Sequence, residues 1–148
     1  MSTIKDYSPR VGPAYLGTNF GQLRTARAKY DFAVDGGATA LITPKTGDTI
    51  PDNAILLACY INSTTAVLAS GGAANVSVGL SAGAGGAAAL LAATAKASFS
   101  LDAILVGVPV PATPIKMTAA GRITITPDTN ALTAGVIEVV VIYYQASA

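Results

Sequence analysis

Apolar and polar positions alternate along much of the chain with a period of two residues. The first clear example has five apolar side chains on one face, namely Ala26, Ala28, Tyr30, Phe32 and Val34. Charged residues occupy most of the opposite face. Because side chains two positions apart lie on the same face of a strand, the pattern predicts a half-buried strand. The run Asp35-Gly36-Gly37 then predicts a turn, since glycine tolerates positive φ.

Similar short segments recur along the rest of the chain. The further strands expected from alternation or from a short apolar run are residues 38–43, 54–61, 65–69, 75–80, 101–108, 115–117, 122–126 and 136–144. We expect 115–117 to pair with 122–126 across Ala119-Ala120-Gly121. Turn signals at intervals of about 8–12 residues are typical of a sandwich or barrel and too close for βαβ units. The fold class is therefore all-β: a jelly-roll-like β-sandwich of about eight short strands, with another β-sandwich or a small barrel as the alternative.

Residues 81–98 give two signals. Alanine favours a short helix over Ala87–Lys96, whereas the glycines before it favour a loop. We expect a loop, with the short helix as an option.

The last predicted strand, Val136–Tyr144, is apolar on both faces. A strand of this kind is covered on both sides, which places it in a sheet interior or at a subunit interface. The residues assigned to an oligomer seam on this basis are Val136, Val139, Val141 and Tyr143.

The first 25 residues show no sustained period and contain Pro9, Gly12, Pro13, Gly17 and Gly21. They predict an extended arm, which leaves residues 26–148 as a single β-sandwich domain. The first 29 residues carry a net charge of +4 and the remainder carries −3, so arm and body differ electrostatically.

The arm has two readings. It is either a solvated terminus or a segment that orders on an acidic or apolar partner surface. In the second case the expected contacts are aromatic anchors and charge-assisted hydrogen bonds from Tyr7, Tyr15, Phe20, Arg10, Arg24 and Arg27. Five positive charges over 29 residues are a thin footprint for nucleic acid, so no nucleic-acid partner is expected.

Composition narrows the setting in which the chain works. Apolar residues make up 51% of the chain, charged residues make up 11%, and no charge lies between Asp52 and Lys96. Typical soluble domains carry about 25% charged residues, so a membrane or identical neighbours must cover part of this surface. The most apolar window, 78–95, consists mostly of glycine and alanine, and no signal peptide opens the chain. We therefore expect self-association and no membrane partner.

Few residues offer chemistry. The chain has no histidine, which excludes a Ser-His-Asp triad and histidine metal sites. Cys59, the single cysteine, lies in an apolar run and is expected to be a small buried hydrophobic residue. Two carboxylate pairs, Asp31 with Asp35 and Asp48 with Asp52, lie at turns, where aspartate is favoured because its side chain hydrogen-bonds to the backbone. A calcium site at these turns and a carboxylate enzyme are the remaining alternatives. We predict no enzymatic activity, no metal and no cofactor.

Three stretches carry a family resemblance: Arg27–Gly37, Thr46–Pro51 and Ala131–Val136. They are similar to small virion proteins of tailed bacteriophages, which resemble head decoration, or cement, proteins. The likeness extends over residues 26–145 in its arrangement of strands and turns and does not include the arm. It implies a small β-rich subunit, often trimeric, that binds the major capsid protein on the outer surface of the virion. The alternative is the head domain of a phage fibre or tail protein that binds a host receptor or glycan, with Tyr143-Tyr144 as a stacking surface.

Overall fold

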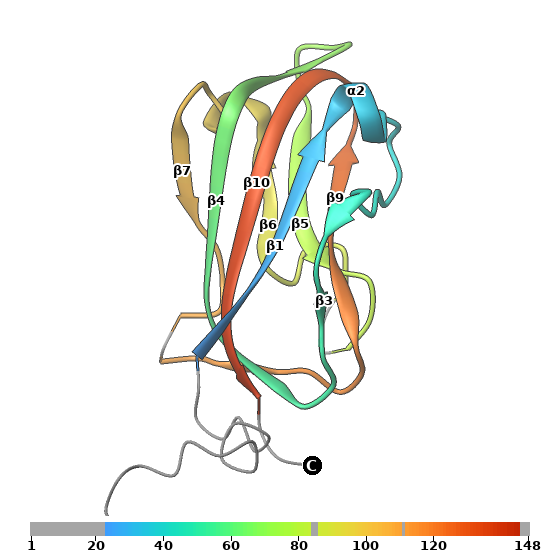
Figure 1. The fold of residues 1–148 in the computed structure, drawn as a ribbon. Coiled ribbons are helices and arrows are strands. Elements are labelled where there is room, and N and C mark those ends of the chain that lie inside the picture. The colour runs from blue at the N-terminus through green and yellow to red at the C-terminus, as the bar shows by residue number, and fades with distance from the viewer. Residues whose placement is uncertain (1–22, 84–85, 111, 146–148) are drawn as a thin grey trace, which may run out of the picture.

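Two antiparallel sheets face each other in the computed structural model, which describes residues 23–83, 86–110 and 112–145 (Figure 1). The first sheet has the order β2 (Thr46–Gly47), β1 (Leu23–Asp31), β10 (Leu132–Gln145), β4 (Ala54–Ala69) and β7 (Ala103–Val106), and β8 (Ile115–Lys116) also pairs with β4. The second sheet has the order β3 (Thr49–Ile50), β9 (Gly121–Asp128), β5 (Asn75–Leu80) and β6 (Leu91–Ala95). The helical segments are α2 (Phe32–Asp35) and the 3₁₀ turn η1 (Lys96–Ser98).

The order of the strands is that of a jelly roll. When β2 and β8, which only extend the first sheet, are set aside, the chain changes sheet at every step except from β5 to β6. The first strand, β1, and the last, β10, are neighbours in the first sheet, and β4 from the middle of the chain lies on the other side of β10. This connectivity confirms the predicted all-β sandwich.

The core is built from the inward-facing positions of both sheets. In β1 the side chains of Ala26, Ala28 and Tyr30 are buried, while Arg27 and Lys29 are exposed, as the alternation predicts. Each large apolar side chain buried in this way contributes about 1.5–3 kcal/mol. The Tyr30 hydroxyl donates to the carbonyl of Gly36 (2.7 Å). Burial, with the nearby charges of Asp35 and Asp31, raises its pKa to about 12.

The chain direction changes sooner after β1 than the sequence pattern predicts. Residues 32–35 form α2 rather than continuing the strand, because the Asp31 carboxylate caps the helix by accepting from the Ala33 amide (2.9 Å). Gly36, with φ of 78°, ends the helix. At its other end β1 begins at Leu23, three residues before the expected start of the domain.

Strand β4 is one long strand where two were predicted. The break expected between the strands 54–61 and 65–69 does not form. The buried Ser63 hydroxyl instead donates to the carbonyls of Phe99 and Thr65 (both 3.1 Å). With its polar group satisfied, Ser63 can stay inside the core while the strand continues.

Three further expectations about secondary structure or strand pairing are wrong. Residues 38–43 form no named strand and contribute one bridge, between Ile42 and Ile125. Strand β8 pairs with β4 and not with β9, which lies in the other sheet. The option of a helix over 87–96 is replaced by β6, whose pairing with β5 outweighs the helix propensity of alanine.

Part of the outer face of the second sheet is buried as well. Ser77 and Thr124 point away from the core, yet both are buried. Gly79 has no side chain, and the segment that follows β5 returns to lie directly against it. The return is held by hydrogen bonds from the Leu80 amide to the Gly86 carbonyl (3.1 Å) and from the Leu90 amide to the Val78 carbonyl (2.9 Å).

Replacing Gly79 with alanine should destabilise the fold. The new Cβ would overlap the carbonyl oxygen of Gly86 and the backbone of Ala87. We expect the free energy of unfolding to fall by about 1–3 kcal/mol in chemical denaturation. Gly72→Ala is the control, because a Cβ there meets nothing within 4 Å. Equal stability of the two variants would contradict this account of the covering segment.

Candidate interaction surfaces

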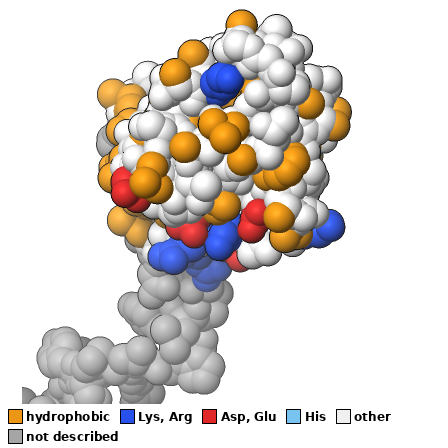
Figure 2. Space-filling view, turned by 90° about the horizontal axis from the view of Figure 1, so that it is seen from above, with side chains coloured by type: hydrophobic (Ala, Val, Ile, Leu, Met, Phe, Trp, Pro, Cys, Tyr) orange, Lys and Arg blue, Asp and Glu red, His pale blue; other side chains and the backbone are white. Residues whose placement is uncertain are grey.

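Charge is distributed unevenly over the sandwich. The charged side chains along β1 and the elements beside it are Arg24, Arg27, Lys29, Asp31, Asp35, Lys45, Asp48 and Glu138. Strands β6 and β7, which end the two sheets on the opposite side, contain no charged residue. Seen end-on, most charged side chains gather along one side of the molecule (Figure 2). We call these regions the charged side and the uncharged side.

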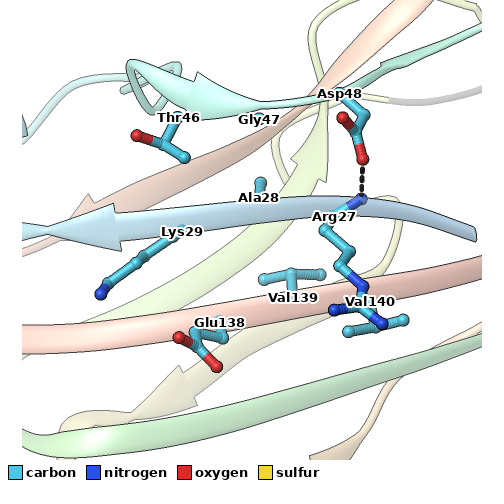
Figure 3. Close-up of a pocket in the computed structure, with 9 residues that line it drawn as sticks. All are labelled: Arg27, Ala28, Lys29, Thr46, Gly47, Asp48, Glu138, Val139 and Val140. Carbon is cyan, nitrogen blue, oxygen red and sulfur yellow. Dashed lines mark hydrogen bonds between the residues drawn. The ribbon is translucent and has the colours of Figure 1, made fainter.

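A groove of about 340 Å³ lies on the charged side, across β2, β1 and β10 (Figure 3). It is lined by Arg27, Ala28, Lys29, Thr46, Gly47, Asp48, Glu138, Val139 and Val140. Gly47 pairs with Ala28, and these small residues leave the space that longer side chains enclose. The Arg27 amide donates to the Asp48 carboxylate (2.8 Å), and the Asp48 amide donates to the Arg27 carbonyl (2.7 Å). These two bonds hold β2 against β1.

The groove is suited to polar contact. It presents two cations, Arg27 and Lys29, and two carboxylates, Asp48 and Glu138. The Arg27 side chain extends over β10 beside Val140 (Figure 3). A guanidinium can bind a carboxylate through two parallel hydrogen bonds.

The carboxylates singled out in the sequence hold turns. Asp31 caps α2, and Asp35 accepts from the amides of Asp31 (3.0 Å) and Lys45 (2.9 Å). Asp48 binds β1, and Asp52 accepts from the Asn53 amide (2.7 Å). Within the described residues no cluster of three or more Cys, Asp or Glu side chains could hold a metal ion. The geometry therefore gives these four residues structural roles.

Cys59 is buried in the core. Burial raises the pKa of its thiol to about 12. A thiol in this state is protonated at neutral pH and is a poor nucleophile.

Thiol labelling should report this burial. With the pKa raised from 9.0 to about 12, the thiolate fraction at pH 8 falls about a thousandfold. We expect an aromatic disulfide reagent to label Cys59 slowly in the folded protein and at once in 6 M guanidinium. Cys59→Ala supplies the background. Rapid labelling of the folded protein would contradict the buried position.

The predicted contact residues fall into two groups. Tyr7, Arg10, Tyr15 and Phe20 lie outside the described residues. Arg24 and Arg27 both lie on β1, where Arg24 is half-buried and Arg27 is exposed. The two arginines thus belong to the first strand of the sandwich.

The residues expected to form an oligomer seam face two directions. Val139, Val141 and Tyr143 point into the core of the same chain, where they are at most 6% exposed. They pack inside one sandwich and are closed to a neighbouring subunit. Val136 is half-buried on the outer face of the sheet. The prediction that this strand lies in a sheet interior is confirmed, because β10 pairs with β1 on one edge and β4 on the other.

Sequence reasoning missed a run of exposed apolar side chains. These belong to Ile104, Val106, Val108 and Val110, on β7 and the segment after it. Their spacing of two residues is visible in the sequence. The half-buried Leu105 and the buried Gly107 and Pro109 alternate with them but are also apolar, so the pattern alone does not say which set faces outward.

No family model and no curated protein matches this chain. No helix among the described residues has the length and apolar character needed to span a membrane.

Chains of solved phage capsids do match it in structure. One belongs to the capsid of Ralstonia phage GP4, with a TM-score of 0.57, 15% identity, and coverage of 87% of this chain and 88% of that chain. A second belongs to the acid-stable capsid of Helicobacter pylori bacteriophage KHP30, with a TM-score of 0.60, 13% identity, and coverage of 86% and 91%. A third belongs to the capsid asymmetric unit of cyanophage Pam1, with a TM-score of 0.58, 18% identity, and coverage of 84% and 86%. At these identities the likeness shows a shared fold.

Proposed function

We propose that this protein is a virion structural protein of a tailed bacteriophage that decorates the head as a cement subunit. The observation that carries the proposal is the match of nearly the whole jelly roll to chains of three phage capsids. The matched chains are of similar length, since at least 86% of each is covered. In this role the protein binds the major capsid protein on the outer surface of the virion and strengthens the lattice.

The subunit works as a homo-oligomer, and a trimer suits the resemblance to decoration proteins. The low charge of the body supports this part of the proposal, because few charges oppose association. A closed oligomer also lets one subunit type bind a symmetric lattice through several identical contacts at once.

The role is structural and needs no catalysis or cofactor. The carboxylates hold turns through backbone amides, and the one thiol is protonated in the core. The sequence also offers no histidine to act as a base.

Attachment uses the N-terminal arm together with the charged side. Arg24 and Arg27 continue the basic sequence of the arm onto β1, and Arg27 is exposed beside the groove. Tyr7, Arg10, Tyr15 and Phe20 supply the remaining contacts. The partner surface is acidic protein, with no role for nucleic acid or membrane.

The alternative, a receptor- or glycan-binding head of a fibre or tail protein, has less support. Tyr143 is buried in the core, so the proposed stacking surface is reduced to the half-buried Tyr144. The structural matches are all chains of capsids.

Deletion of residues 1–22 tests the attachment device. The deletion stops at 22 because Leu23 already pairs with Tyr144 in the sheet. We expect unchanged unfolding and oligomer mass, together with loss of co-sedimentation with heads of the cognate phage assembled without this protein. Failure of the full-length protein to bind such heads would refute the decoration role. Unfolding of the shortened protein would instead make the arm part of the core.

Neutralising the charged side tests the electrostatic contribution. Arg27→Ala with Lys29→Ala should weaken binding to heads on the order of tenfold at low salt, and the effect should shrink as salt rises. The control is Lys116→Ala, an exposed lysine on β8 at the opposite part of the sheet. An equal loss of binding per charge removed in the control variant would show that only net charge matters.

A further inference from the structure

The uncharged side of the sandwich is formed by two edge strands, one from each sheet. β7 pairs with β4 on one edge, and β6 pairs with β5 on one edge. In the described part of the chain no strand pairs with the other edge of either, as the order of the sheets shows. An unpaired apolar edge is a site of association unless charge or proline protects it.

Large apolar side chains form a ridge along β7. Ile104 is 72% exposed and Val106 is 63% exposed. Their register partners on β4 are Asn62 and Tyr60, and Tyr60 is itself exposed, so the ridge continues onto the outer face of the first sheet. No charged residue occurs between Asp102 and Lys116.

A groove of about 420 Å³ lies next to the ridge, where the two sheets meet. Ala88, Leu91 and Ala92 line one wall, and Val108 and Val110 line the other. The walls are joined by a hydrogen bond from the Val108 amide to the Leu90 carbonyl (2.8 Å). Val106 borders both groove and ridge, so the two form one continuous apolar surface.

We propose that this side binds a second copy of the same chain, with the ridge of one copy seated in the groove of the next. The inference rests on the proposed oligomer and names the surface that forms it. Ridge and groove have different shapes, so the contact joins two different patches and can close into a ring such as a trimer. Both patches lie on one side of the sandwich, where they can surround a symmetry axis.

Charge supports a second copy as the occupant. The ridge and the groove themselves carry no charged side chain, so they suit a partner that is also apolar and uncharged where the two meet. The ridge and groove of another copy meet this requirement. The other lateral edge of the first sheet, at β1 and β2, carries Arg27, Lys29 and Asp48, which disfavour edge pairing there. The distribution of charge therefore directs self-association to the β6–β7 side.

Three substitutions test the inference. Ile104→Asp places a charge on the ridge, and Ala92→Arg fills the groove. Leu41→Asp is the matched control, since Leu41 is 49% exposed outside both patches. Mass is measured by light scattering and sedimentation, and circular dichroism checks that each variant is folded.

We expect the wild-type chain and the Leu41→Asp variant to have a mass several times 14.7 kDa, and both test variants to fall to the monomer mass. A monomeric wild type, or an oligomer that survives Ile104→Asp, would overturn the inference. If the wild type is monomeric and deletion of residues 1–22 raises binding of an apolar dye, the chain's own N-terminal segment is the occupant, which also overturns it.

Binding to heads separates this inference from the proposed function. An oligomer formed through another surface that still binds heads removes only the inference. Dissociation of both test variants, together with a wild type that does not bind heads, supports the surface and removes the decoration role.

Discussion

The last strand of the chain, β10, lies between the first strand and β4 and pairs with its neighbours along both edges. Leu23 pairs with Tyr144, so both ends of the described domain lie at one end of the sandwich (Figure 1). These pairings join positions far apart in the sequence. The chain entropy lost when they form is offset only when the core between the sheets is complete. The core residues of β10, among them Val139 and Val141, therefore pack inside the subunit and do not contact a neighbouring one.

Because these residues are buried, the interaction surfaces that we propose lie on the lateral sides of the sandwich. On one side, β2 is held to β1 by the paired hydrogen bonds of Arg27 and Asp48, and charged groups border a groove. On the other side, β6 and β7 present apolar side chains and unpaired edges. A subunit with two such sides can associate with its own kind through one and contact a charged partner through the other. That division of surfaces agrees with the decoration role proposed above.

Much of the fold could be predicted because its strands follow local patterns. The alternation at Ala26–Tyr30 became the half-buried strand that was expected, and the apolar run before Tyr144 became a strand in a sheet interior, one of its two expected places. Predictions failed where distant partners decided the outcome. Residues 91–95 extend because β5 pairs with them, and Ser63 stays within a strand because the Phe99 carbonyl accepts its hydroxyl. For the candidate surfaces, Arg27 as a contact residue stays a prediction, and the pattern missed the exposed Ile104, because its neighbours on both faces are apolar.

The sequence by itself determined the all-β class, the scarcity of catalytic groups and the separation of a basic N-terminal region from a charge-poor body, because these depend on composition and on a two-residue period. Only the tertiary structure decided which apolar face of β10 forms the core and which apolar residues remain outside. The physical reason is that, when a strand is apolar on both faces, its own sequence does not show which face turns toward the core. Its orientation is set by the side chains packed against it, and these come from strands distant in the chain.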